Sequence, residues 1–285
     1  MSDADSGLGG AQRIAERVVP EGSLVAWWLG GSGFVFKTPG GTQIYVDPYL
    51  SDAARAIFGL ARAFPAPITA EDARPDVVIC THWHEDHLDP EAIPIIARHS
   101  AATRFVMPPS AMARALSWGI ARERIAPLAA GGSLTIRDVT ISHVPARHEP
   151  GIAGWEVPDA MGVIVGAAGL QVYHTGDTEY DLRLRALAGR GIDAIFACIN
   201  GTGGNMDAHE AALLAWRLGS RLVVPMHHRL WAENPDGGTL DPRLFAETYR
   251  ALGGRGRVVA PDLLGEILIG PQRDVLPSGA PSEDD

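Results

Sequence analysis

Apolar runs of strand length, separated by glycine turns, dominate the first part of the chain. Three of them, at 23–29, 33–38 and 42–48, follow one another closely. Runs of this length between glycines predict a meander of antiparallel strands. A fourth run, at 75–80, is continuously apolar and ends at a polar stretch rich in histidine, which predicts a buried strand.

The rest of the first half alternates between helix and strand signals. The segment 51–75 places alanine, arginine and proline around the apolar sequence AIFGLARAF, which predicts a short helix and a long loop. We leave three roles open for this segment. It can form a pocket wall or lid, it can pack as an ordinary helix, or it can form an oligomer contact. Helical spacing of apolar residues predicts helices at 91–99 and 109–117, with a short strand at 105–108 between them.

The second half repeats this plan. Asp207 and Glu210 are spaced as in a capping box and predict the start of a helix, and a second helix is expected at 241–253. Strand runs followed by strand–helix alternation, occurring twice, predict an α/β fold with two sheets packed face to face and helices outside. The expected strands and strand pairs lie at 134–146, 161–177, 193–200, 221–226, 256–261 and 265–270.

Length limits the number of domains. At about 100–200 residues per domain, 285 residues correspond to one large domain or two small ones. No low-complexity linker divides the chain, so we expect one domain over 21–272. We expect the N-terminal segment 1–20 to be flexible and the tail 273–285, rich in proline, serine and acidic residues, to be disordered.

Charge and cysteine usage exclude several classes of protein. A formal charge of −10 argues against a protein that holds a nucleic-acid backbone. Cys80 and Cys198 are the two cysteines, and both lie in apolar runs, which is typical of buried thiols in a reducing compartment. No apolar run reaches the roughly 18–20 residues of a membrane span, and no secretory signal is evident. We therefore expect a cytoplasmic protein with no membrane or nucleic-acid partner, and leave a homo-oligomer open.

The densest chemical signal is the stretch 81–89, which directly follows the expected buried strand. In an extended segment residues two apart point the same way, so His82 and His84 can face one metal ion. Asp86 and His87 come after the chain turns and can reach a second ion. Imidazole suits zinc, and a carboxylate also admits manganese.

A single histidine after a strand is usually a polar loop residue, but four potential ligands within six residues are different. Burying three imidazoles and an acid without a metal would cost a few kcal/mol in unpaired polar groups. Further histidines and acids occur at three later strand ends, 145–148, 173–178 and 225–228. Because strand ends of two sheets can meet at one edge, these stretches can complete a site for two ions about 3.5–4 Å apart.

The order of these motifs resembles the ligand series of the metallo-β-lactamase superfamily. HxHxDH, a strand-end histidine, a GD(T) turn and a P-x-H follow one another within about residues 23–270. The resemblance implies a four-layer αββα sandwich and two divalent ions, zinc or manganese. The ligands that it implies are His82, His84 and His148 for the first ion, Asp86, His87 and His227 for the second, and Asp177 as a bridge between them.

Within this superfamily the chain is similar to the L-ascorbate 6-phosphate lactonase branch, through the segments 22–30, 173–177 and 227–231. That similarity implies a cytoplasmic manganese-dependent hydrolase that opens a sugar-derived lactone. The chain departs from the branch by lacking an insertion before the metal motif, by carrying His148, and by having Gly31 in place of a cysteine. These departures leave the hydrolase assignment intact and the substrate and metal open.

Five further residues flank the implied ligands. Asp47 ends a strand and is either a turn acid or an acceptor for the free N–H of a ligand histidine. His174 is either a pocket residue or a buried, hydrogen-bonded histidine, and His228, beside an implied ligand, would line the pocket. Arg229 and Tyr180 are candidates to contact an anionic substrate, the alternative for the arginine being a surface ion pair.

The reaction that these residues favour is hydrolysis of a lactone or related carboxylic ester by a metal-bound hydroxide, with a sugar-derived or anionic lactone as a candidate substrate. Asp86 or Asp177 would orient the nucleophile and move a proton toward the leaving alkoxide. The alternative is a phosphodiesterase that acts on a small substrate with the same two ions. No G-x-S-x-G elbow is present, so a serine hydrolase is not expected.

Overall fold

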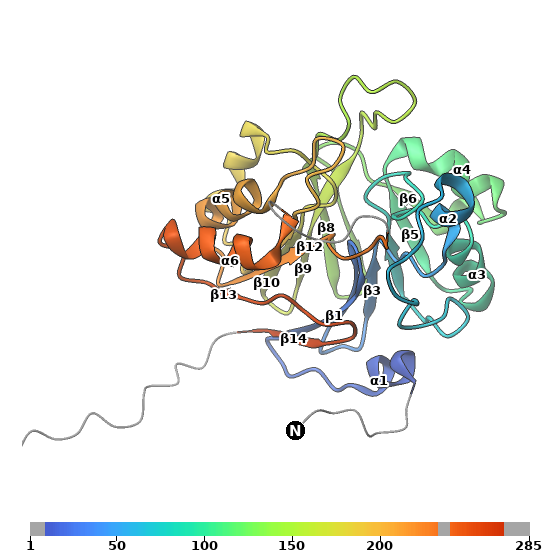
Figure 1. The fold of residues 1–285 in the computed structure, drawn as a ribbon. Coiled ribbons are helices and arrows are strands. Elements are labelled where there is room, and N and C mark those ends of the chain that lie inside the picture. The colour runs from blue at the N-terminus through green and yellow to red at the C-terminus, as the bar shows by residue number, and fades with distance from the viewer. Residues whose placement is uncertain (1–8, 233–239, 271–285) are drawn as a thin grey trace, which may run out of the picture.

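The computed structural model describes residues 9–232 and 240–270, and in this part of the chain two sheets of seven strands each lie face to face (Figure 1). The first sheet combines the strands of the first half with the final strand of the chain. In spatial order its strands are β14 (Glu266–Ile269), β1 (Leu24–Gly30), β2 (Gly33–Lys37), β3 (Gln43–Val46), β4 (Val77–Ile79), β5 (Arg104–Met107) and β6 (Ile125–Pro127).

The second sheet is formed by the second half and has the same plan, an antiparallel part followed by a parallel part. In spatial order its strands are β13 (Arg257–Val258), β12 (Leu222–Met226), β11 (Ala194–Cys198), β10 (Leu170–His174), β9 (Met161–Ala167), β8 (Val139–Pro145) and β7 (Ser133–Ile136).

Helices cover the outer faces of both sheets, so the fold is the predicted four-layer αββα sandwich (Figure 1). Within the described residues, no helix has the length and apolar character needed to cross a membrane. The α-helices are α1 (Gly10–Glu16), α2 (Ala53–Phe58), α3 (Ala92–His99), α4 (Met112–Ser117), α5 (Ala208–Leu218) and α6 (Pro242–Ala251), and the 3-10 turns are η1 (Pro109–Ala111), η2 (Arg122–Arg124) and η3 (Leu182–Leu187).

Three apolar layers hold the sandwich together. The central layer lies between the sheets, where Phe34 and Phe36 of β2 meet Phe196 of β11 edge to face, with ring centroids 4.7 and 5.0 Å apart. Edge-to-face aromatic pairs of this kind add to the stabilisation from buried area. The outer layers pack α1, α3 and α4 on the first sheet, and α5 and α6 on the second.

The helix α5 begins as its sequence predicts. The Asp207 side chain accepts hydrogen bonds from the backbone N–H groups of His209 and Glu210, and Glu210 reaches back to the Asp207 N–H. The helix ends at Gly219, which adopts a left-handed conformation with φ of 65°. The expected capping box is therefore confirmed.

Part of the segment 1–20, for which the sequence predicted flexibility, is folded. Residues 10–16 form α1, whose Ile14 is buried against the first sheet. The ammonium group of Lys37 donates to the backbone oxygens of Ile14 (2.9 Å) and Ala15 (2.6 Å) at the end of this helix. The short apolar signal of the helix was insufficient to predict this docking. Residues 1–8 and the tail 273–285 lie outside the described residues.

The strand directions place one edge of the sandwich in position for a site. Strands β3 and β4 are parallel, as are β10, β11 and β12. Strand β8 pairs antiparallel with β9, which pairs antiparallel with β10, so β8 runs in the same direction as β10. The carboxyl ends of these strands therefore face a common edge, which lies where loops from both halves of the chain meet.

We expect Asp138 to stabilise the opposite edge of the sandwich in a pH-dependent way. Its carboxylate accepts hydrogen bonds from the hydroxyls of Thr38 (2.6 Å) and Thr42, which joins the β7–β8 turn to the β2–β3 turn. Burial raises the pKa of Asp138, but these two hydrogen bonds outweigh it, and the pKa lies below its usual value. Because Asp138 is exposed, Asp138→Ala should lower the free energy of unfolding by only about 1 kcal/mol or less at pH 7.

The sign of the pH effect follows from the lowered pKa. The stabilisation is present above the unfolded-state pKa of about 3.9 and is lost as the pH falls through the folded-state value. Urea unfolding of the unsubstituted protein and of Asp138→Ala, at pH 7 and near pH 3, measures the difference in free energy of unfolding at each pH. In a Thr38→Val/Thr42→Val background the pH dependence of the Asp138→Ala effect should become smaller, because a backbone N–H and Arg137 alone would then lower the pKa of Asp138. An unchanged pH dependence there would contradict this account.

Candidate metal centre

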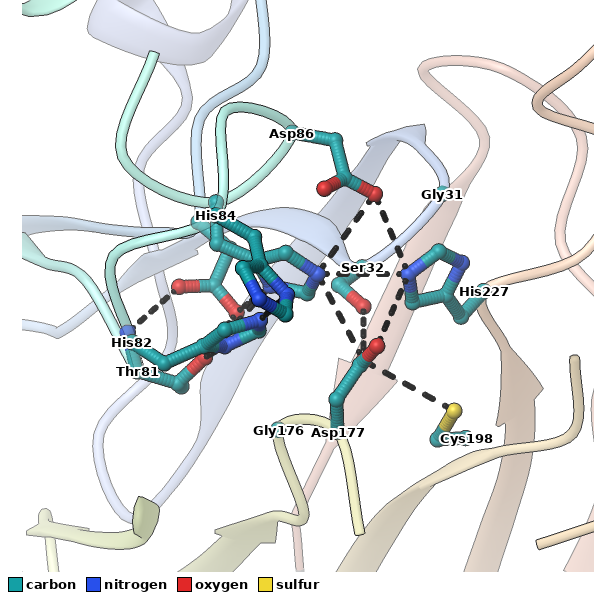
Figure 2. A network of polar contacts seen from close by, with 12 residues as sticks. Gly31, Ser32, Thr81, His82, His84, Asp86, Gly176, Asp177, Cys198 and His227 are labelled. Atoms are coloured by element: carbon teal, nitrogen blue, oxygen red, sulfur yellow. Dashed lines mark hydrogen bonds and ion pairs between the residues drawn. The ribbon is translucent and has the colours of Figure 1, made fainter. Parts of the chain in front are cut away.

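Seven histidine and aspartate side chains converge at the edge where the strand ends of both sheets meet, and Asp86, Asp177 and His227 are seen facing one another in Figure 2. Four of the seven lie in the loop after β4, and the others follow β8, β10 and β12. Every implied ligand is thus brought to one place. The seven are His82, His84, Asp86, His87, His148, Asp177 and His227.

The first group consists of the buried histidines His82, His84 and His148, whose nitrogen atoms point at one another. His84 Nδ1 lies 3.0 Å from His82 Nε2 and 3.1 Å from His148 Nε2. Nitrogens bound to one tetrahedral zinc at about 2.0–2.1 Å lie roughly 3.3 Å apart, close to this spacing. A single hydrogen can bridge only one of the two contacts, whereas a cation would satisfy all three lone pairs.

The second group consists of Asp86, His87 and His227. His227 Nε2 lies 3.2 Å from His87 Nε2 and 3.4 Å from Asp86 Oδ2. Asp177 lies between the groups, because Oδ1 is 3.5 Å from His87 Nε2 and Oδ2 is 3.3 Å from His227 Nε2 and 3.9 Å from His148 Nε2. The arrangement can hold two divalent cations, one in each group, with Asp177 between them.

The outer nitrogens of three histidines are occupied by other partners. His84 Nε2 is 3.1 Å from the backbone oxygen of Trp155, and His87 Nδ1 is 2.8 Å from Asp47 Oδ2. His82 Nδ1 is 3.1 Å from Thr81 Oγ1. Each partner can accept an N–H, which leaves the inward nitrogen without a hydrogen and free to bind a metal. The donor set therefore fits a metal centre.

Asp47 supports two neighbours at once. Its carboxylate accepts from the backbone N–H of Thr81 at 2.7 Å and from the Thr81 hydroxyl at 2.8 Å, and it also holds His87. Asp47 is fully buried at the end of β3 and has a φ of 46°, which is unusual outside glycine. The sequence analysis considered Asp47 as an acceptor for a ligand histidine, and in the structure Asp47 contacts His87, which is one of the implied ligands.

Burial keeps the first group neutral. It lowers the pKa values of His82 and His84, and it lowers the pKa of His148 to about 4. These three imidazoles are therefore uncharged near pH 7. Neutral imidazole is the form that binds a metal ion.

The second group has the opposite electrostatic character. Burial lowers the pKa of His227, but Asp177 and Asp86 outweigh it and raise the pKa to about 9. The pKa of His87 is raised for the same reason. Burial raises the pKa values of the carboxyls, but the histidines outweigh it, so that of Asp177 lies well below its usual range and that of Asp86 is about 2. The two carboxylates thus attract a cation, either a proton or a metal, to this group.

Two residues that the sequence analysis did not single out as site residues, Asn205 and Cys198, contact Asp177 from the side of the second sheet, and a third, Asn200, contacts both of them. Asn205 Nδ2 donates to Asp177 Oδ2 at 2.7 Å and to Asn200 Oδ1 at 2.9 Å. The Cys198 thiol lies 3.7 Å from Asp177 Oδ1 and 3.4 Å from Asn200 Oδ1. Cys198 is buried and unpaired with another cysteine, as expected, but it also contacts a candidate ligand. The polar N-G turn after the β11 strand was the available signal for this network.

His174 is a buried, hydrogen-bonded histidine that does not line the pocket. Its Nε2 lies 2.8 Å from the backbone oxygen of Ser32, and its Nδ1 accepts from the Gly176 N–H at 3.2 Å. Gly176 has a φ of 58°, and a Cβ there would lie 2.6 Å from the Met161 backbone oxygen. His174 and Gly176 therefore fix the turn that presents Asp177.

A pocket of about 260 Å³ opens above the histidine and aspartate groups. His228 lines it, as does Arg229, whose contact with a substrate stays a prediction, and His228 stacks on Trp28 with ring centroids 5.1 Å apart. Tyr180 is not among the described lining residues and packs instead against the apolar layer under α5. The contact of Tyr180 with substrate therefore stays a prediction that the described lining does not support. The 51–75 segment contributes to the wall through α2 and the residues just after it.

Comparisons with known proteins agree with this geometry. The family model described as beta-lactamase superfamily domain matches residues 27–227. A UPF0173 metal-dependent hydrolase of Anaeromyxobacter dehalogenans is 30% identical over 224 residues, which cover 75% of this chain and 77% of that protein. A probable L-ascorbate-6-phosphate lactonase, UlaG, of Salmonella newport is 23% identical over 264 residues, which cover 78% of this chain and 74% of that protein.

Solved structures show the same fold. Igni18, a metallo hydrolase from the archaeon Ignicoccus hospitalis, has a TM-score of 0.68 at 21% identity, covering 86% of this chain and 98% of its own. An isothiocyanate hydrolase from Delia radicum gut bacteria has a TM-score of 0.65 at 18% identity, covering 85% and 98%. The resemblance drawn from the motifs is confirmed at the level of the superfamily. The chain belongs to the metallo-β-lactamase superfamily, as one of its metal-dependent hydrolases.

Proposed function

We propose that the chain hydrolyses a lactone or a related carboxylic ester of small size, using two divalent ions, zinc or manganese, at this centre. The observation that carries the proposal is the Asp177 carboxylate between two groups of ligand atoms at the floor of a pocket. The similarity to a probable lactonase supports the choice of an ester bond. The volume of the pocket supports a small-molecule substrate, because it lies near the lower end of the range of about 300–1,000 Å³ for ligand pockets.

In this proposal each group holds one ion. When bound, such ions lower the pKa of a bound water and polarise a carbonyl oxygen. The ligands are His82, His84 and His148 for the first ion, Asp86, His87 and His227 for the second, and Asp177 for both.

The two acids near the reacting bond differ in their surroundings. Asp177 is buried and is held between the two groups by its hydrogen bond from Asn205. The Asp86 side chain is 18% exposed and borders the pocket, with ion-pair contacts to His87 and His227. Asp86 or Asp177 takes a proton from the attacking water at a carboxylate oxygen. As the carbonyl carbon bonds to the water oxygen and the ester C–O bond breaks, that proton passes to the leaving alkoxide.

Chelation should abolish lactone hydrolysis, and zinc or manganese should restore it. Without ions the buried acids and histidines cannot activate water at neutral pH. The measurement is turnover of γ-butyrolactone before and after EDTA treatment and readdition of each metal, alongside metal content per chain, which should approach two ions. The double variant His84→Ala/Asp86→Ala should lose about two orders of magnitude or more in rate and should bind less metal.

The same turnover assay distinguishes lactone or ester hydrolysis from phosphodiester hydrolysis. Bis(p-nitrophenyl) phosphate serves as the phosphodiester substrate. Faster turnover of this phosphodiester than of any lactone or ester would favour the phosphodiesterase alternative. Undiminished lactone turnover in the double variant would refute the proposed centre.

Asp47→Asn should weaken metal binding about 10–100-fold without unfolding the protein. Asparagine keeps the size of aspartate, tolerates a positive φ and can still accept from the Thr81 N–H. Its NH₂ group, however, would face His87 Nδ1 and force the imidazole hydrogen onto Nε2, the nitrogen that faces the second ion. Zinc affinity measured by competition with a chromophoric chelator tests this effect.

Asp138→Asn is the matched control for this substitution. It makes the same chemical change at the opposite edge of the sandwich and should leave zinc affinity unchanged. Equal zinc affinity in Asp47→Asn and the unsubstituted protein would contradict the role assigned to Asp47.

A further inference from the structure

Two exposed aromatic side chains, Phe58 and Trp155, meet at the mouth of the pocket. Their ring centroids are 5.1 Å apart, and each residue is 39% exposed. Phe58 is the last residue of α2, and Trp155 lies in the loop between β8 and β9. Neither ring is needed to fill the core, so an aromatic pair held open to solvent indicates a surface for an apolar ligand.

The same two segments expose further apolar side chains. Ile57 is 50% exposed beside Phe58, and Ile152 is 44% exposed on the loop of Trp155. Exposed apolar residues that occur singly need no explanation, but here they belong to the two segments that meet at the pocket. Of the four exposed side chains, Phe58 and Trp155 line the pocket, so a bound apolar group would cover these two and recover the free energy cost of their hydration.

The apolar wall continues from the mouth to the metal groups. Leu60, Leu230 and Trp231 line the pocket below the aromatic pair. Trp155 itself is tied to a proposed ligand, because its backbone oxygen lies 3.1 Å from His84 Nε2 and its ring centroid lies 5.5 Å from that of His84. An apolar group against Trp155 would therefore lie beside the bond that is broken.

The charged residues of the wall do not form an anion site. Beyond the proposed ligands, the described lining carries Glu85, Glu149 and Arg229 as its charged side chains. Glu85 pairs with Arg114 at 2.7 Å. Phosphate and carboxylate groups are usually bound by several cationic or N–H donors, whereas the described wall has one arginine and two glutamates.

We propose that the substrate is an uncharged lactone or ester with an apolar, aromatic substituent, and that Phe58 and Trp155 bind that substituent. This inference rests on the proposed ester hydrolysis and adds its substrate class. It replaces the sugar-derived or anionic lactone expected from the sequence. In the reaction, water is consumed and the ester yields a carboxylic acid and an alcohol, so no further reactant is needed.

A matched series of substrates tests the inference. γ-Butyrolactone is compared with the same ring carrying a phenyl or a carboxylate group at the γ carbon. The phenyl lactone should have a kcat/KM about tenfold above the unsubstituted ring, and the carboxylate lactone should fall below it. In Trp155→Ala and in Phe58→Ala the ratio of phenyl to unsubstituted kcat/KM should fall toward one, mainly through KM.

Two control variants match these substitutions in residue type or position. Trp216→Ala removes a tryptophan of 40% exposure on α5, outside the described pocket lining, and Ile57→Ala removes the neighbour of Phe58 that does not line the pocket. Both should keep the phenyl preference. Trp155→Phe should retain part of it, and thermal unfolding verifies that each variant is folded.

A binding measurement separates this inference from the proposed reaction. 4-Phenylbutan-1-ol, a neutral aromatic compound without an ester, should bind the unsubstituted protein and bind at least fivefold more weakly to Trp155→Ala in calorimetry. If no lactone or ester is turned over but this difference is found, the reaction is wrong and the aromatic subsite stands. If lactones are hydrolysed with no phenyl preference, with a preference for the carboxylate, or with a phenyl preference that Trp155→Ala retains, the inference is overturned.

Discussion

Five buried imidazoles, the buried Asp177 carboxylate and the partly buried Asp86 carboxylate lie together at one edge of the sandwich, and their lone pairs and charges must be satisfied there. Unpaired polar groups in such a place cost several kcal/mol each, and isolated charges cost more. The inward nitrogens cannot satisfy one another, because three of them face a common point. A cation, with outward hydrogen bonds that hold each imidazole in the right tautomer, resolves the conflict.

This requirement also accounts for the backbone around the site. Asp47 and His227 adopt positive φ values of 46° and 58°, and Glu149 and Arg229 beside the pocket do the same. Such conformations cost about 1–3 kcal/mol each and persist only where the surroundings enforce them. The two sheets supply that constraint, since the N–H of His227 donates to the Gly31 oxygen of the first sheet at 2.8 Å. These strained backbone conformations therefore allow side chains at several strand ends to point toward one place.

The parts of the molecule that the sequence predicts are those encoded locally. Strand length, glycine turns and the capping box at Asp207 are local signals, and they led to the two sheets and to α5. The stretches that carry the candidate ligands were found because each follows an expected strand, and the individual ligands within them were implied by the resemblance to the superfamily. Asn205 and Trp155 were missed because their roles depend on contacts with Asp177 and His84, which lie far away along the chain. No local pattern encodes such a contact.

The proposed ligands at the floor of the pocket and the apolar side chains of its wall are different residues, although some of them share a loop, so the residues for chemistry differ from those for selectivity. Strand ends supply the floor, where the acids Asp86 and Asp177 offset much of the charge of any bound ions. Floor charge alone is therefore a weak basis for choosing an anionic substrate. The wall comes from α2, from Trp155 in the β8–β9 loop that also carries His148, and from Leu230 and Trp231 after β12. Because loops can change without disturbing the strand ends, the wall is where substrate preference has to be sought, and here that wall is largely apolar.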